Sequence, residues 1–92
     1  MIRSFKDRRL RRFHEAGDRS RLTPELVGKI ENILARLDAA VTVEDMGLPG
    51  FRLHPLKGDL KGFWSVTVRA NWRVVFRFEE GDAYNVELTD YH

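Results

Sequence analysis

The stretch FWSVTVRANWRVVFRFEEGDAYNVELTD, residues 63–90, decides the fold because apolar and polar side chains alternate along it. Successive side chains of a β-strand point to opposite faces, so this period of two gives each strand one buried and one exposed face. RAN (residues 69–71) and EEGDA (residues 79–83) interrupt the alternation as hairpin turns would. With FRLHPL (residues 51–56) as an earlier strand, the second half of the chain predicts an antiparallel meander.

The first half predicts two helices. One runs from Lys6 to Ala16 and ends at Gly17, with Leu10 and Phe13 as its narrow apolar stripe. The other has Thr23 as its N-cap and proline at its first position. Apolar residues then recur with the helical period at Leu26, Val27, Ile30, Ile33, Leu34 and Leu37.

Together these patterns predict an α+β domain with both N-terminal helices packed on one face of an antiparallel sheet of about four to five strands. MIRSF (residues 1–5) is either a short strand or the lead-in to the first helix. The 92 residues suit a single domain spanning 1–92.

Composition predicts a cytoplasmic protein with no membrane partner. The chain has no cysteine, so it needs no oxidising compartment. Its first residues are charged where a signal peptide would be apolar, and no apolar run is long enough to span a bilayer.

The net charge of +2 hides two basic and two acidic blocks. Residues 1–12 carry +5 and residues 52–73 carry +4, whereas residues 13–51 carry −3 and residues 74–92 carry −4. Two interpretations are open: the basic blocks bind a polyanion, or they are solvated faces whose charges mix in space. Four arginines of the first block surround the helical stripe: Arg8, Arg9, Arg11 and Arg12.

The polar face of the sheet suits phosphodiester chemistry. Strand parity turns Asn71 and Arg73 away from the helices, and the strand before them supplies His54, followed by Lys57. Histidine has an ordinary pKa of about 6.5 and can carry protons near neutrality. Arginine binds phosphate through a planar fork, and lysine acts as a point charge. The terminal residues Asp90, Tyr91 and His92 can add a carboxylate, a phenol and a second imidazole.

Each of these residues also has an ordinary structural explanation. Arginines and lysines keep a sheet face and a turn hydrated, and His54 precedes Pro55 at a strand end. The sequence shows neither a cluster of metal ligands nor a Ser or Cys nucleophile with a triad, so we expect no metal and no cofactor. Spacing alone leaves catalysis and simple solvation both open.

The run LHPLKGDLKGFWSVTVRANWRVVFRFEEGDAYNVELTDYH (residues 53–92), with the opening MIRSFK, resembles the HigB toxins of the RelE superfamily. HPLKGD, W-S-V-x-V-x-x-N-W-R and the terminal DYH carry the resemblance. It implies a RelE-like microbial-RNase fold and a ribosome-dependent mRNA endonuclease, which cleaves when the 2′-oxygen attacks the adjacent phosphate. The catalytic residues so implied are His54, Lys57, Arg73, Asp90, Tyr91 and His92, with Asn71 beside the bound RNA.

The resemblance also implies partners. These are the ribosome with its mRNA and a HigA-type helix-turn-helix antitoxin, through which the toxin would reach operator DNA. In this setting Arg8, Arg9, Arg11 and Arg12 would dock on ribosomal RNA, unless they only hydrate the helix. The alternative function is a catalytically idle module that binds its antitoxin and acts as a transcriptional corepressor.

Overall fold

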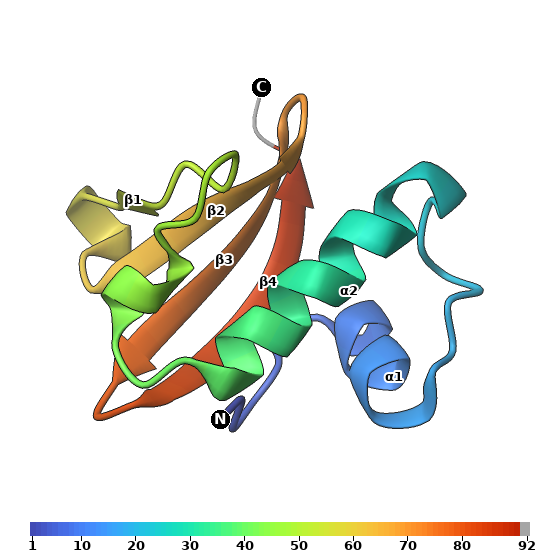
Figure 1. Cartoon of the computed structure of the whole chain (residues 1–92), viewed down its shortest axis with the longest axis horizontal. Coiled ribbons are helices and arrows are strands. Elements are labelled where there is room, and N and C mark those ends of the chain that lie inside the picture. Colours follow the sequence, from blue (N-terminus) through green and yellow to red (C-terminus); the bar gives the residue numbers. More distant parts are fainter. Residues whose placement is uncertain (91–92) are drawn as a thin grey trace.

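Four strands form one antiparallel sheet in the order β1-β2-β3-β4, which confirms the predicted meander (Figure 1). The computed structural model describes residues 1–90. Its helices are α1 (Arg8–Ala16) and α2 (Pro24–Ala39), with short 3-10 turns η1 (Val43–Met46) and η2 (Gly58–Leu60). Its strands are β1 (His54–Pro55), β2 (Phe63–Arg69), β3 (Trp72–Glu79) and β4 (Asp82–Asp90).

The two hairpin turns lie where the alternation breaks. Glu80 and Gly81 join β3 to β4 with φ angles of 48° and 82°, the two positive values that a tight type I′ turn requires. Between β2 and β3, Ala70 has a φ of 52°, and a register shift lies between Thr67 and Arg69. This irregular turn sets the position of the residues that follow it on β3.

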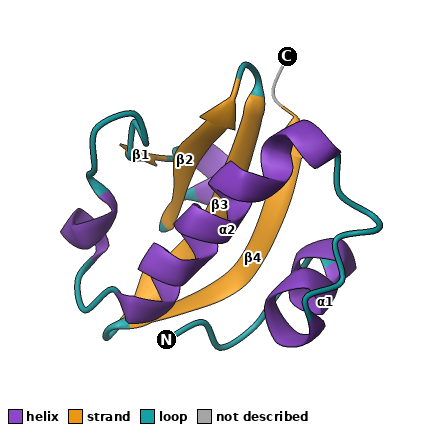
Figure 2. Cartoon of the chain, turned by 45° about the vertical axis from the view of Figure 1, so that its right-hand side comes forward, coloured by secondary structure: helices purple, strands orange, loops and turns teal. Residues whose placement is uncertain are grey.

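Helix α2 crosses one face of the sheet, while α1 lies beside β4 (Figure 2). All six apolar residues predicted for α2 are buried. They meet the strand side chains of matching parity, and Val66, Val74, Phe76 and Val86 have no exposed surface. Leu10 and Phe13 join the same core from α1. The α+β architecture with both helices against the sheet is therefore confirmed.

Helix α1 begins two residues later than its pattern predicts. Asp7 is its N-cap, with an extended backbone and a carboxylate that accepts a hydrogen bond from the Arg9 N–H. Gly17 ends the helix in the left-handed region at a φ of 71°, as the glycine predicts.

The N-terminal segment runs along β4 and pairs with it only through isolated bridges, so it does not form a continuous strand. Ile2 and Phe5 make isolated parallel bridges to Ala83 and Val86. Hydrogen bonds of 2.7 Å from Arg3 N to Ala83 O and 3.0 Å from Lys6 N to Val86 O hold it there. This segment occupies the outer edge of β4 and delivers the chain directly to Asp7.

The predicted strand over residues 51–56 is shorter than its alternation suggests. Only His54 and Pro55 form β1, because Arg52 has a φ of 51° and Pro55 has no N–H to donate. The segment still follows β2, with bonds from Thr67 N to Phe51 O and from Leu56 N to Phe63 O.

The sheet face turned away from the helices is only partly hydrated. Ser65 and Val75 point there by parity, yet they are 4% and 2% exposed.

None of the helices among residues 1–90 is both long and apolar enough to cross a membrane.

Candidate functional site

A groove on this second face gathers side chains from three strands and the segment before them. It encloses about 380 Å³ and is lined by Arg52, His54, Leu56, Ser65, Thr67 and Arg73. Two of the six are among the predicted site residues, His54 and Arg73. The structure thus brings the imidazole of His54 on β1 and the guanidinium of Arg73 on β3 to one concave surface.

Strand register explains why these two side chains converge. His54 pairs with Ser65 on β2, and Arg73 on β3 pairs with Thr67. They are therefore two strands and two residues apart, which corresponds to roughly 12 Å between their Cα atoms.

The hairpin turn orients Arg73. Its Nη1 donates to the carbonyl oxygens of Ala70 at 2.6 Å and Trp72 at 3.2 Å. Among the described residues no partner binds its Nε and Nη2, so this edge of the guanidinium keeps the two parallel donors that bind phosphate. The turn at Ala70, which has a positive φ, thus contributes to the site because the Ala70 carbonyl oxygen accepts a hydrogen bond from Nη1 of Arg73.

The other predicted residues lie around this groove. Lys57 is exposed at the start of η2, three residues after His54, but it is not in the groove lining. Asn71 is exposed in the β2–β3 turn, and Asp90 ends β4 opposite Trp72. Tyr91 and His92 lie outside the described residues.

Sequence reasoning missed three polar residues of the groove: Arg52, Ser65 and Thr67. Ser65 and Thr67 share the parity that turns Arg73 outward, so the alternating pattern alone was sufficient to find them. Arg52 gave no such signal, because its position depends on the irregular backbone before β1.

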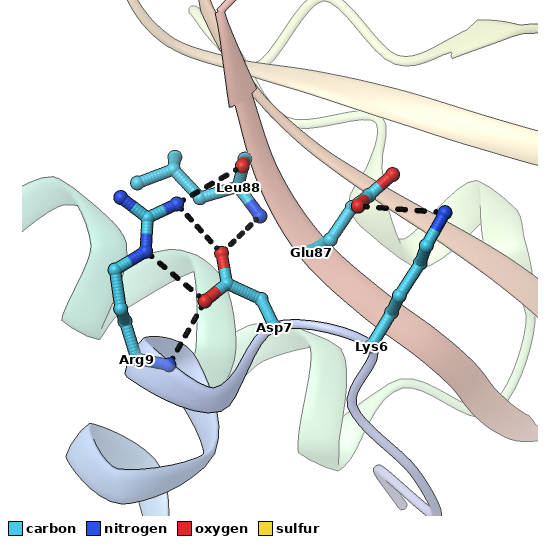
Figure 3. A network of polar contacts seen from close by, with 5 residues as sticks. All are labelled: Lys6, Asp7, Arg9, Glu87 and Leu88. Atoms are coloured by element: carbon cyan, nitrogen blue, oxygen red, sulfur yellow. Dashed lines mark hydrogen bonds and ion pairs between the residues drawn. The ribbon is translucent and has the colours of Figure 1, made fainter.

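Of the four arginines predicted on α1, Arg9 has a local structural partner. Its Nε and Nη2 donate to the Asp7 carboxylate at 3.1 Å and 2.9 Å, and Nη2 also reaches the carbonyl of Leu88 at 3.3 Å (Figure 3). Asp7 in turn accepts from the Leu88 N–H at 3.1 Å. The pair therefore binds both backbone groups of one residue on β4.

This contact fixes the charge of Asp7. Burial by itself raises the pKa of the carboxyl group, but hydrogen bonds from Arg9 and from the Leu88 backbone outweigh it. The net result is a pKa below the ordinary value, and the bond to Asp7 raises the pKa of Arg9.

Among residues 1–90, only arginines line a second hollow, of about 270 Å³. They are Arg8, Arg9, Arg12 and Arg21. Arg11 is exposed on the same helix but is not part of the lining.

Within residues 1–90, no three His, Asp or Glu side chains form a group that could hold a metal ion.

Solved structures of bacterial toxins share this fold. The chain superimposes on a mutant of YafQ from E. coli with a TM-score of 0.62, covering 98% of this chain and 91% of that one at 14% identity. A YoeB/ParE toxin from Agrobacterium tumefaciens gives a TM-score of 0.57, with 99% and 96% covered at 19% identity. At these identities the likeness shows the RelE-like fold alone.

Sequence relatives identify the family. The family model described as "RelE-like toxin of type II toxin-antitoxin system HigB" matches residues 3–92. The chain is 44% identical to "Endoribonuclease HigB" of Proteus vulgaris over the full length of both proteins. It is 40% identical to "Toxin HigB-1" of Vibrio cholerae serotype O1, over 96% of this chain and 95% of that protein. The chain therefore belongs to the HigB-type toxins of the RelE superfamily.

Proposed function

We propose that this chain, an endoribonuclease toxin of a type II toxin–antitoxin system, cleaves mRNA on the translating ribosome without a metal ion. The observation that supports this most directly is the placement of His54 and Arg73 in one groove, with the phosphate-binding edge of Arg73 unoccupied by described residues. RNA supplies its own nucleophile, so a cation for the phosphate and groups that carry protons are sufficient for cleavage.

The reaction is a transesterification. A base removes the proton of the 2′-hydroxyl, and the 2′-oxygen forms a bond to the adjacent phosphorus. The bond from phosphorus to the 5′-oxygen breaks, and an acid protonates that oxygen. The products are a 2′,3′-cyclic phosphate and a free 5′-hydroxyl, so neither water nor an oxidant is consumed.

The chain's residues take the following roles in this proposal. Arg73 and Lys57 supply a guanidinium and an ammonium group that stabilise the negative charge that builds on the phosphate. His54 and His92 carry the protons, with Asp90 orienting an imidazole and Tyr91 assisting or stacking on a base. Asn71, exposed in the β2–β3 turn that orients Arg73, contacts the bound RNA.

Family membership implies an antitoxin partner. In our proposal this partner is a HigA-type helix-turn-helix protein, and the toxin reaches operator DNA only through it. Because translating ribosomes supply the substrate, the protein acts in the cytoplasm.

The test is primer extension on a translated mRNA, with and without ribosomes. Wild-type protein should cut only when ribosomes are present. His54→Ala and Arg73→Ala should each cut at least about 100-fold more slowly, the usual cost of removing a group that stabilises the transition state.

Arg69→Ala is the matched control. Arg69 ends β2 beside the same hairpin, but it pairs with Glu25 at 3.0 Å and does not line the groove. It should cut like the wild type. A folded wild-type protein that cuts no mRNA under either condition would contradict the proposal and favour the corepressor function.

A further inference from the structure

Three polar residues of the groove of His54 and Arg73 have no role in the proposed reaction. Ser65 and Thr67 come from β2, and Arg52 comes from the segment before β1. Among residues 1–90, two arginines and no carboxylate line the groove. The groove therefore has a surplus of positive charge, and Arg73 accounts for only part of it.

The backbone of Arg52 is in a conformation that favours glycine. Its φ of 51° lies in the left-handed region, where a Cβ atom crowds the neighbouring carbonyl oxygen. The preceding residue, Phe51, is held on both sides: its N–H donates to the Leu48 carbonyl at 3.0 Å, and its own carbonyl accepts from the Thr67 N–H at 2.6 Å. Arg52 thus turns the chain from this anchor toward β1 in a strained conformation.

The guanidinium of Arg52 gains no polar contact within the described protein that would offset this strain. It lines the groove but takes part in no hydrogen bond or ion pair with residues 1–90. Arg9, in contrast, binds the Asp7 carboxylate and the carbonyl of Leu88. Strained residues concentrate where a protein binds a ligand. The strain and the unoccupied guanidinium together indicate that position 52 serves a ligand rather than the fold.

Hydroxyl groups lie between the two arginines of the groove. Thr67 pairs with Arg73 on one side and bonds to the segment of Arg52 on the other, so two strand spacings, or roughly 10 Å, separate the Cα atoms of the arginines. Ser65 lies two residues along the same face and is only 4% exposed. Neither hydroxyl makes a hydrogen bond within the part of the chain that the structure describes. Because buried hydroxyls are almost always hydrogen-bonded, Ser65 also indicates a ligand in the groove.

An RNA chain is a ligand that suits this arrangement. In the proposed reaction Arg73 binds the scissile phosphate, and the chain carries a further phosphate at each neighbouring nucleotide. Arginine binds phosphate through parallel donors, and serine and threonine hydroxyls also donate to nucleic-acid backbones. The groove thus offers donors on both sides of Thr67 to an anion longer than a single phosphate.

We infer that Arg52 is an RNA-binding residue, which holds the phosphate next to the scissile one; the inference rests on the proposed function, because it describes how the substrate of that reaction is held. Two phosphates bound at once fix the direction of the RNA chain across β2. The scissile bond is then presented to His54 and Arg73 in one orientation, which is what rapid reaction of a bound substrate requires.

The experiment uses ribosomes programmed with a synthetic mRNA whose cleavage site is first located by primer extension. In a set of otherwise identical mRNAs, one phosphate beside that site is replaced by an uncharged methylphosphonate. Single-turnover cleavage gives kcat/KM for each combination of toxin and mRNA. Neutralising one of the neighbouring phosphates should slow the wild type about 10- to 100-fold, the usual value of a hydrogen bond to a charged group.

The Arg52→Gln variant identifies the contact. On unmodified mRNA it should cut about 10- to 100-fold more slowly than the wild type, and neutralising the same phosphate should slow it by no more than about twofold further. Arg52→Lys keeps the charge but loses the fork, so its rate should be intermediate. Arg69→Gln is the matched control: it removes a charge outside the groove and should respond to every mRNA as the wild type does.

A glycine variant separates RNA binding from folding. Arg52→Gly relieves the backbone strain that Arg52→Gln retains, so it should unfold at a higher temperature than Arg52→Gln. Both variants lack the guanidinium and should cut equally slowly. A structural role for Arg52 would instead make the more stable variant the more active one.

The outcomes distinguish this inference from the proposed function. Wild-type protein that cuts the programmed mRNA while Arg52→Gln cuts it equally fast would overturn the inference alone. So would a slow Arg52→Gln that loses as much as the wild type when each neighbouring phosphate is neutralised, because the arginine and the phosphate would then act independently. Wild-type protein that cuts no mRNA would refute the proposed function, and the inference with it.

Discussion

Replacing Asp7 with alanine should destabilise the protein more than any other change of a charged residue on α1. The carboxylate is 8% exposed and accepts four hydrogen bonds, three from Arg9 and one from the Leu88 N–H. Loss of an N-cap costs about 1 kcal/mol. A partly buried N–H left without an acceptor costs about 1–3 kcal/mol more.

The ion pair adds little to this total. Arg9 is 41% exposed, so water screens its attraction to Asp7 and lets the freed guanidinium hydrate. We therefore expect Asp7→Ala to lower the free energy of unfolding by about 3 kcal/mol. For a domain of this size, such a loss lowers Tm by roughly 12–24 °C.

The effect should depend on pH in a defined direction. The pKa of Asp7 is lower in the folded protein than in the unfolded chain, where it is about 3.9. Its ionisation therefore stabilises the fold fully above about pH 4 to 5, and this stabilisation is lost as pH falls through the folded pKa. The difference in stability between wild type and Asp7→Ala should accordingly be largest at neutral pH and shrink in acid.

The assay is thermal and urea unfolding of both proteins between pH 3 and pH 7. Asp18→Ala is the control, because Asp18 also accepts two local hydrogen bonds but is not bonded to the sheet. Its loss should change the stability much less than the loss of Asp7, because water can replace the hydrogen bonds of an exposed carboxylate. A Tm for Asp7→Ala within about 4 °C of the wild type, or equal to that of the control, would refute the reasoning.

Three further predictions concern stability and are checked by urea unfolding. Ile33→Ala should cost about 2–5 kcal/mol, since the side chain has no exposed surface and its removal leaves a cavity; a smaller loss would mean that the helix–sheet contact readily collapses. Gly81→Ala should cost about 1–2 kcal/mol, because its φ of 82° strains any L-residue, and an unchanged midpoint would argue against the type I′ turn. Glu25→Gln should change stability by less than about 0.5 kcal/mol, because Glu25 and Arg69 are 73% and 65% exposed; a loss above about 1 kcal/mol would show that their ion pair is not screened.

Much of the fold could be predicted from local patterns. The alternation over residues 63–90 predicted three strands, and the glycine at position 81 marked one of their turns. The 3.6-residue period of α2 predicted its buried face in full. These predictions succeeded because each side chain's direction follows from its own strand or helix, whatever that element packs against.

The ends of β1 and of the first helix were predicted less accurately, because the backbone there is irregular. Residues 51–56 alternate like a strand, but the positive φ of Arg52 and the proline at 55 limit β1 to two residues. The first helix was predicted to start at Lys6, because helical spacing carries no information on whether Asp7 caps or enters the helix. Both differences arise from backbone conformations that depend on hydrogen bonds to other strands.

By itself the sequence determined the α+β class, the apolar faces and the residue types suited to binding phosphate, because these depend on composition and period. Only the tertiary structure decided which polar groups meet. It brought Ser65, Thr67 and Arg52 beside His54 and Arg73, and Arg21 beside Arg8 and Arg12. It also bonded both Asp7 and Arg9 to the backbone of Leu88 on β4. The physical reason is that strand register and loop path juxtapose residues distant in the chain, and no local period encodes that pairing.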